Sequence, residues 1–276
     1  MAMNEDYSLH SLFSLDGKHA LVTGGSGGLG MMMSKGLLQN GAKVTISSRS
    51  QEKCDKALEE LRQYGECEGV CADLTRADER SRLIAELTKS GDGRGLDILI
   101  NNAGTNWGAR LEDYPDEGFA KVVNTNLNAV FSVTRDLVPL LEVEGTDSDP
   151  SRIINIGSMD GLQVPVAQRV PTYAYSASKA ALHHLTRTLA VDLARRNITV
   201  NAVAPGFFES KMTDYVLANF RKDIESDCPL GRIGQPGEIA GIVIYLASRA
   251  GNYTNGTVIP VDGGTSISKG DRPWID

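Results

Sequence analysis

The sequence lacks the features that mark several classes of protein. Its four cysteines include no Cys-x-x-Cys pair and no nearby histidine completes a ligand set, so we expect no metal site. It has no long basic run and a formal net charge of −7, which disfavours nucleic acid as a partner. No apolar stretch approaches the roughly 20 residues that cross a bilayer, and 1–10 lack the pattern of a leader. These absences predict a cytoplasmic protein that binds neither membrane nor nucleic acid.

The features that are present are typical of one globular enzyme domain. The chain has 276 residues, of which 41% are hydrophobic and 23% charged, with 29 glycines spread along it. This length suits a single large α/β sheet with a substantial core, so we predict one domain over 1–276. The one low-complexity patch is the acidic stretch 144–150, which we interpret as an exposed loop.

Apolar, β-branched runs recur along the chain and are separated by segments with helical patterns. Most runs are continuously apolar, which predicts strands covered on both faces, as in a parallel sheet with right-handed helical crossovers. The predicted fold is therefore a Rossmann-type, doubly wound α/β sheet of about seven strands, in which ligands bind beyond the carboxyl ends of the strands. The predicted strands are 19–23, 43–47, 68–72, 97–101, 152–157, 199–204 and 257–261.

A glycine-rich turn at 23–30 lies between the first predicted strand and a helical pattern over 31–39. Glycines allow a tight turn and let a pyrophosphate approach backbone N–H groups at a helix N-terminus, and the strand-turn-helix context favours a dinucleotide site. The turn also carries a Gly-x-Ser-x-Gly pattern, as in the nucleophile elbow of hydrolases. That alternative requires a later acid and then a histidine, whereas the only histidines after the turn, 183–184, lie in a helical segment.

The residues after the next three strands suit a phosphorylated dinucleotide. Where an acidic side chain would bind the ribose hydroxyls of NAD, the chain has Ser48 and Arg49. A guanidinium offers forked donors to phosphate, so NADP(H) is favoured over NAD(H), with a surface arginine as the alternative interpretation. Asp73 is placed to accept from an adenine amine, and Ala103 and Gly104 let the chain lie flat beside the adenosine ribose, although each alone is also typical of a turn or helix cap.

Tyr175 and Lys179 are the predicted chemical centre. Their spacing of four places them on one face of a helix, where an ammonium is expected to lower the phenol pKa. Ketone reduction needs a proton for the developing alkoxide and a second hydroxyl that hydrogen-bonds the oxygen, and Ser158 at the end of the fifth strand supplies that hydroxyl. Tyr173 lacks a cation four residues later and is interpreted as pocket lining.

In this order and spacing, the glycine turn, the Asn-Asn-Ala-Gly run, Ser158 and the Tyr-x-x-x-Lys pair resemble the short-chain dehydrogenase/reductase family. The resemblance covers 18–264, with extensions at 1–14 and 266–276 and a substrate-loop region at about 206–235. It implies a catalytic tetrad of Asn126, Ser158, Tyr175 and Lys179, in which Tyr175 is the general acid/base. It also implies that Lys179 holds the nicotinamide ribose and that Asn126 anchors a relay water, with Asn124 and Asn128 as the alternatives to Asn126.

The resemblance extends the predicted cofactor site and shows three departures. Ser210 stands at a threonine position, Gly27 stands where NADP(H)-preferring relatives often have a basic residue, and Ser158 and Tyr175 are further apart than in many relatives, which predicts an enlarged loop at 163–172. The cofactor-binding residues predicted from the pattern and the resemblance, besides Tyr175 and Lys179, are Gly24, Ser26, Gly28, Leu29, Gly30, Ser48, Arg49, Asp73, Leu74, Asn102, Ala103, Gly104, Pro205, Gly206, Phe208 and Ser210.

Within this family, the stretches 102–109, 178–183 and 258–264 resemble those of bacterial β-ketoacyl reductases associated with rhamnolipid synthesis. This predicts NADPH-dependent reduction of a 3-oxoacyl thioester or an apolar, polyketide-like ketone, in a pocket that includes Trp107, Asp160, Phe207 and Met212. The alternatives are oxidation of a sugar, steroid or other secondary alcohol, or a non-catalytic NADP(H)-binding sensor. The resemblance also implies a homotetramer or homodimer, with helices near 119–141 and 175–195 at one interface and the C-terminal segment at another.

Overall fold

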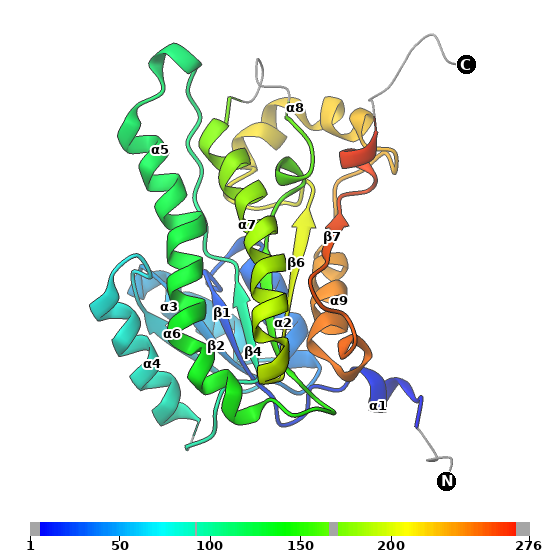
Figure 1. Cartoon of the computed structure of the whole chain (residues 1–276). Helices are drawn as coiled ribbons and strands as arrows, with labels where there is room; N and C mark the ends of the chain where they lie inside the picture. The colour runs from blue at the N-terminus through cyan, green and yellow to red at the C-terminus, as the bar shows by residue number, and fades with distance from the viewer. Residues whose placement is uncertain (1–5, 92, 166–170, 269–276) are drawn as a thin grey trace.

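The computed structural model describes residues 6–91, 93–165 and 171–268. Across these ranges seven strands form one parallel sheet in the order β3-β2-β1-β4-β5-β6-β7 (Figure 1). Every predicted strand is present, with ends that differ by at most one residue from those expected. The strands are β1 (His19–Thr23), β2 (Lys43–Ser48), β3 (Cys67–Cys71), β4 (Ile98–Asn101), β5 (Ser151–Ile156), β6 (Ile198–Pro205) and β7 (Val258–Val261).

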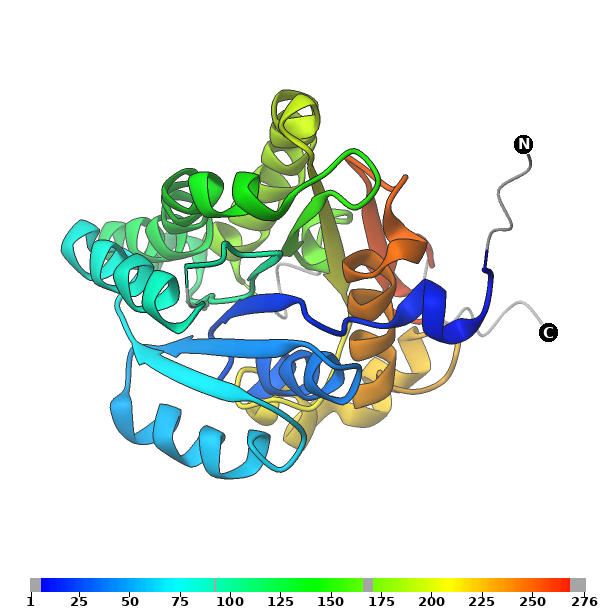
Figure 2. The same ribbon diagram turned by 90° about the horizontal axis from the view of Figure 1, so that it is seen from below.

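Helices cover both faces of the sheet, as the continuously apolar strands predicted (Figure 2). Side chains of β1 alternate between two cores: Ala20 and Val22 pack with α2, α3 and α9, whereas Leu21 packs with α4, α6 and α7. The helices are α1 (Leu9–Phe13), α2 (Gly28–Gln39), α3 (Gln51–Leu61), α4 (Ala77–Ser90), α5 (Asp116–Val123), α6 (Ala129–Glu144), α7 (Tyr173–Leu193), α8 (Asp214–Asp227) and α9 (Pro236–Ala247).

Two sequence-based expectations about these elements are wrong in detail. The outer strands β3 and β7 are only partly buried, because an edge strand has a neighbour on one side and β3 carries Glu68 and Gly69 instead of apolar side chains. Helix α2 begins at Gly28, three residues earlier than the helical pattern, so the last glycines of the turn already form its first turn. Tyr175 lies in the first turn of α7, which begins at Tyr173.

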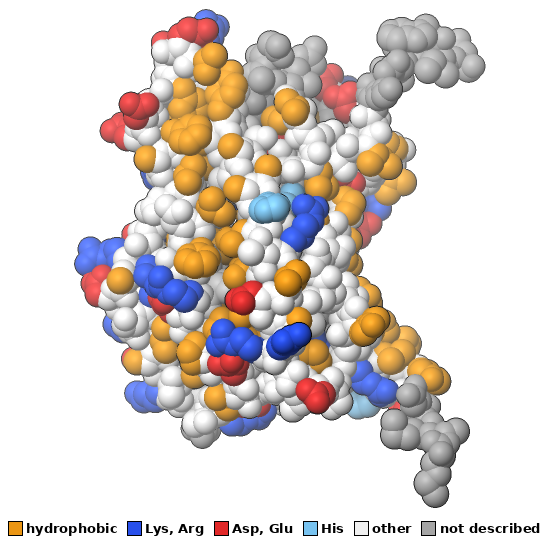
Figure 3. All heavy atoms as spheres, viewed as in Figure 1, with side chains coloured by type: hydrophobic (Ala, Val, Ile, Leu, Met, Phe, Trp, Pro, Cys, Tyr) orange, Lys and Arg blue, Asp and Glu red, His pale blue; other side chains and the backbone are white. Residues whose placement is uncertain are grey.

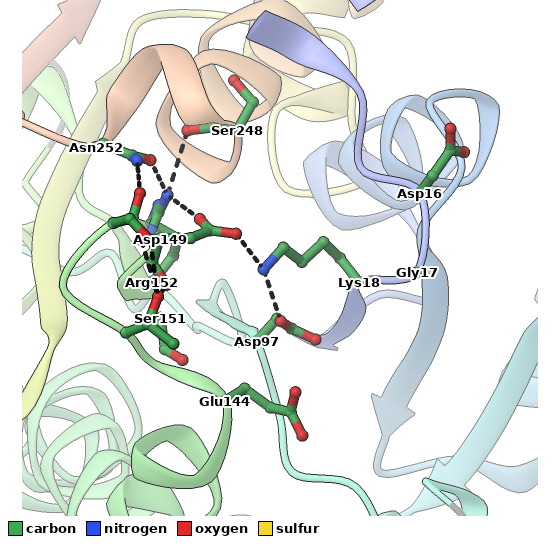
Figure 4. Close-up of polar contacts among 12 residues, drawn as sticks. Asp16, Gly17, Lys18, Asp97, Glu144, Asp149, Ser151, Arg152, Ser248 and Asn252 are labelled. Carbon is green, nitrogen blue, oxygen red and sulfur yellow. Dashed lines mark hydrogen bonds and ion pairs between the residues drawn. The ribbon is translucent and has the colours of Figure 1, made fainter. Parts of the chain in front are cut away.

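Charged residues at the amino ends of the strands are paired with one another (Figure 4). Lys18 donates to Asp97 at 2.9 Å and to Asp149 at 2.7 Å, and Asp149 in turn pairs with Arg152 of β5 at 3.0 Å. Arg152 is 2% exposed and also donates to the Ser248 carbonyl at 3.4 Å. The cluster ties β1, β4 and β5 to the end of α9, at the edge of the sheet opposite the carboxyl ends where the predicted site residues lie.

Candidate active site

A cavity of about 500 Å³ lies at the carboxyl ends of β1 to β4, where the strand order reverses between β1 and β4. It brings together eight of the predicted cofactor residues and one that sequence reasoning missed, Lys53 in the first turn of α3. The sequence does contain a signal for Lys53: a cation is unfavourable near a helix N-terminus, so a lysine there suggests a binding role. The predicted residues that line the cavity are Gly24, Ser26, Ser48, Arg49, Asp73, Leu74, Ala103 and Gly104.

The glycine turn is shaped to leave room above the N-terminus of α2. Gly24 has φ of +63°, and a Cβ on Gly30 would lie 2.3 Å from the Gly24 carbonyl oxygen, so a side chain at either position would displace the turn. Gly27 precedes the helix and makes no side-chain cap. The first N–H groups of α2 are therefore available to an anion, and this cradle fits the pyrophosphate of a dinucleotide.

Asn102 holds the turn in place. Its Nδ2 donates to the Thr23 carbonyl at 2.9 Å and to the Gly24 carbonyl at 3.1 Å, while its backbone N–H donates to the Thr23 hydroxyl at 2.9 Å. Its amide donor thus holds the loop that forms the cradle, and its predicted contact with the cofactor stays a prediction. Ser210 lies close to the same turn, since a Cβ on Gly28 would be 3.2 Å from its Cβ.

Two cations follow β2, with Arg49 directly after the strand and Lys53 in the first turn of α3. Among the described residues, neither Arg49 nor Lys53 forms a side-chain hydrogen bond or an ion pair, although both line the cavity. Ser48 beside them accepts a hydrogen bond from Ser26 at 3.0 Å. Burial opposes the ionisation of Asp73, but hydrogen bonds from Thr75 and the charge of Arg49 outweigh it, and the net pKa of Asp73 is lowered. Unpaired cations in a cavity fit a ligand with an additional phosphate.

The predicted catalytic side chains meet beyond the end of β5. Ser158 is the N-cap of the 3₁₀ helix η3 (Met159–Gly161), and its side chain hydrogen-bonds the hydroxyl of Tyr175. Lys179, one turn further along α7, has its Nζ 5.6 Å from the Tyr175 ring centroid and donates to the Ile156 carbonyl at 2.7 Å. A Cβ on Gly104 would lie 3.8 Å from Lys179 Nζ, so the catalytic group adjoins the adenosine-side loop.

Burial dominates the protonation of this group. It raises the pKa of Tyr175 to about 12, despite the lowering effect of the Ser158 hydrogen bond, and the charge of Asp160 raises it further. It also lowers the pKa of Lys179 to about 8. The expectation of a lowered tyrosine pKa is therefore wrong for this structure, because desolvation outweighs a lysine whose ammonium is directed at a carbonyl. A phenol with this pKa carries its proton at neutral pH.

Asn126 lies in the π-helix η2 (Asn124–Asn128), which interrupts the passage from α5 to α6. It is fully buried, whereas Asn124 and Asn128 are exposed, so the structure favours Asn126 among the three candidates. Its Oδ1 accepts from the Thr105 N–H at 2.9 Å, and its Nδ2 donates to the Thr105 carbonyl at 3.0 Å and to Ser178 at 3.1 Å. The side chain thus fixes the loop after β4, and its predicted role in anchoring a relay water stays a prediction.

The apolar residues predicted for the substrate pocket are distributed over separate places. Trp107 packs over Gly118 of α5, while Phe207 lines a second cavity of about 460 Å³ and Met212 is half exposed. Phe208, expected to contact the cofactor, is 2% exposed and its side chain belongs to the hydrophobic core. Asp160 lies beside Tyr175. The central part of the expected loop, 166–170, is outside the described residues.

Searches for relatives agree with this geometry. A family model described as enoyl-(acyl carrier protein) reductase matches residues 24–266. A rhamnolipids biosynthesis 3-oxoacyl-[acyl-carrier-protein] reductase of Pseudomonas aeruginosa is 46% identical, over 93% of this chain and 99% of that protein. The chain belongs to the short-chain dehydrogenase/reductase family. It is therefore an oxidoreductase of the type that interconverts a carbonyl group and an alcohol.

Two further relatives support the same assignment. A tropinone reductase homolog of Arabidopsis thaliana is 37% identical, over 93% of this chain and 95% of that protein. The solved structure of a Pseudomonas aeruginosa RhlG/NADP active-site complex matches with a TM-score of 0.89 and 45% identity, over 94% of this chain and all of that one. In the described ranges no helix is long and apolar enough to span a bilayer, and no cluster of His, Cys, Asp and Glu is suited to a metal.

Proposed function

We propose that the protein is an NADPH-dependent reductase that converts a ketone to a secondary alcohol, with Tyr175 as the proton donor. The observation that carries the proposal is a half-buried phenol that keeps its proton at neutral pH, held beside Ser158 and Lys179, with Lys179 next to Gly104 of the dinucleotide crevice. NADPH, when bound, supplies the hydride that adds to the carbonyl carbon. The Tyr175 hydroxyl gives its proton to the developing alkoxide, and the Ser158 hydroxyl stabilises that oxygen by a hydrogen bond.

Activity assays with a conservative variant test this mechanism. We expect Tyr175→Phe to abolish most NADPH consumption with a ketone while leaving NADPH binding, measured by fluorescence titration, nearly unchanged. Tyr245→Phe is the matched control. Tyr245 lies in α9, away from the crevice, and its hydroxyl hydrogen-bonds the Thr254 hydroxyl at 2.7 Å. Full activity of the Tyr175 variant would refute the proposed role. If the variant loses both NADPH binding and turnover, Tyr175 has a structural role. If the unmodified protein binds NADPH but turns over no ketone, the non-catalytic sensor is favoured.

Arg49 and Lys53 are proposed to bind the 2′-phosphate together. A hydrogen bond to a charged group contributes about 1.5–3 kcal/mol, so we expect Arg49→Ala and Lys53→Ala each to raise the Kd for NADPH by roughly 10- to 100-fold and to leave NADH binding unchanged. Lys56→Ala is the control, because Lys56 lies exposed on the same helix and does not line the cavity. Equal effects on both cofactors would contradict the assignment.

The proposed substrate is a 3-oxoacyl thioester or another apolar ketone. Support comes from the bacterial relative, whose name specifies a 3-oxoacyl group, and from apolar side chains such as Phe207 and Ile224 that line the second cavity together with charged ones. The test is NADPH consumption with acyl thioesters, polyketide-like ketones, steroids and sugars. Turnover of sugars alone would replace this proposal with the alternative of a polyol dehydrogenase.

We further propose a cytoplasmic homotetramer or homodimer. Large hydrophobic side chains are exposed on neighbouring helices, with Phe119 of α5 and Phe131 of α6 each more than 40% exposed and Val191 of α7 82% exposed. Figure 3 shows hydrophobic side chains gathered where α5 lies. The cysteines in the described ranges are free thiols, as in a reducing compartment. Light scattering of Phe131→Lys tests the interface, and an unchanged mass above that of a monomer would place the contact elsewhere.

A further inference from the structure

Asp160 occupies a fixed position between the two catalytic hydroxyl residues. It is in the middle of η3, two residues after Ser158, and its backbone N–H donates to the Ser158 hydroxyl at 3.2 Å. Its backbone carbonyl accepts from Ser176, the residue after Tyr175, at 2.7 Å. The main chain of Asp160 is therefore held by both the β5 side and the α7 side of the active centre, which limits where its carboxylate can reach.

The carboxylate of Asp160 has no partner of its own. Within the described part of the chain, no group forms a hydrogen bond or an ion pair with the carboxylate. Burial alone raises the pKa of Asp160 to about 6. Asp97 shows the usual arrangement: it is 4% exposed, and its carboxylate accepts from Lys18 and from the His19 N–H at 2.8 Å. Asp160 is only half-buried, so its carboxylate remains accessible to a small ligand while the partial loss of solvent still disfavours its charge.

The surroundings of Asp160 show what such a group can act on. Among the described residues with a shifted pKa, the charge of Asp160 acts on Tyr175, the proposed proton donor, so the carboxylate lies near the place where the substrate oxygen must sit. Other ionisable side chains of α7 on this side are directed elsewhere: Lys179 donates to the Ile156 carbonyl, and His183 packs against Gly157 and Gly161. An acceptor at this position, left unpaired by the protein, is suited to a donor on the substrate.

We propose that Asp160 is a specificity-determining residue that accepts a hydrogen bond from a donor group on the substrate, a hydroxyl or an ammonium close to the reacting carbonyl. The inference rests on the proposed ketone reduction and adds a second recognised group to it. Among ketones of one size, the enzyme then prefers the member that carries a donor, because a plain ketone leaves the carboxylate unpaired in the complex.

Three small ketones of similar size test the inference: 4-hydroxy-2-butanone, 4-(dimethylamino)-2-butanone, which is a cation at neutral pH, and 2-pentanone, which has no donor. With the full chain and NADPH, we expect Asp160→Asn to lower kcat/KM for at least one donor ketone by roughly 10-fold or more, mainly through KM, and to leave 2-pentanone within about twofold. A fall for the hydroxyketone identifies a hydroxyl as the recognised donor, and a fall for the amino ketone alone identifies a cation.

Asp160→Asn, Asp160→Ala and one control variant distinguish the possible outcomes. Asp192→Asn removes an exposed carboxylate at the far end of α7 and is expected to change none of the three activities. Asp160→Ala should reproduce the Asn effect if the carboxylate itself is recognised. Equal losses for all three ketones, or no change in their ratio, would overturn the inference. No turnover of any ketone by the unmodified protein would instead refute the proposed function, so the two failures are distinguishable.

Discussion

Replacing Asp160 by asparagine should stabilise the folded protein, and the gain should depend on pH. Burial raises the pKa of this carboxyl from 3.8 to about 6. A carboxyl whose folded pKa is raised binds protons more strongly in the folded state, so its contribution to stability falls as pH rises. The penalty is absent below about pH 4, grows between about pH 4 and 6, and is complete above that range.

The size of the effect follows from the pKa difference. A change of about 2 units, at about 1.4 kcal/mol each, gives a penalty of about 3 kcal/mol at pH 8. Asparagine has nearly the same shape and cannot ionise, so Asp160→Asn should raise the free energy of unfolding by up to that amount at pH 8. The gain should decline steadily towards pH 5, where the wild-type carboxyl is largely protonated when folded.

Urea unfolding of the chain without cofactor, at fixed protein concentration and at several pH values between 5 and 8, measures the difference. Asp192→Asn on the exposed face of α7 serves as the control and should show no pH-dependent gain. A variant that is less stable than wild type at pH 8, or whose advantage is the same at every pH, would refute the reasoning. A gain in stability combined with lost discrimination between ketones would show that the carboxylate is retained for function.

Three other substitutions probe how the site is held. Asn126→Ala removes three buried hydrogen bonds and should lower the free energy of unfolding by about 3 kcal/mol in urea titrations. Gly30→Ala places a Cβ 2.3 Å from the Gly24 oxygen and should raise the Kd for NADPH by roughly tenfold or more in fluorescence titrations. Asp149→Ala unpairs the buried Arg152 and should cost about 3 kcal/mol, yet leave kcat/KM of the folded enzyme unchanged. These expectations would be contradicted if Asn126→Ala left the stability intact, if Gly30→Ala left the NADPH affinity unchanged, or if Asp149→Ala selectively reduced the activity.

Most strands were predictable because they are short apolar runs whose burial the sequence already encodes; β3 and β7 at the outer positions are the exceptions. β1 is the clearest case, since all five residues are buried and its bounds match the prediction. Helix starts were less predictable. Glycine is a poor helix former, so nothing local indicates that α2 begins at Gly28; the turn is forced into place by contacts such as that of Asn102 with the Gly24 carbonyl.

The composition of the site was predictable, but its electrostatics were not. The four-residue spacing correctly places Lys179 beside Tyr175, because helix geometry is a local property. Whether the phenol pKa rises or falls depends on desolvation by segments distant in sequence and on where the ammonium is directed, and neither is encoded in the spacing. Lys53 was missed for a similar reason: its relevance depends on α3 placing it over the same cavity as Arg49.

The charged side chains at the two ends of the strands differ in whether they are paired with other protein groups. At the amino ends, Lys18, Asp97 and Asp149 satisfy one another, and this arrangement favours a rigid frame. At the carboxyl ends, Arg49 and the carboxylate of Asp160 form no hydrogen bond or ion pair with the described residues, although Arg49 lines the cavity and Asp160 lies beside the catalytic tyrosine. Unpaired charges reduce stability unless a ligand completes them. The asymmetry therefore indicates that stability is concentrated at one edge and that the unpaired groups of the other are reserved for phosphate and substrate.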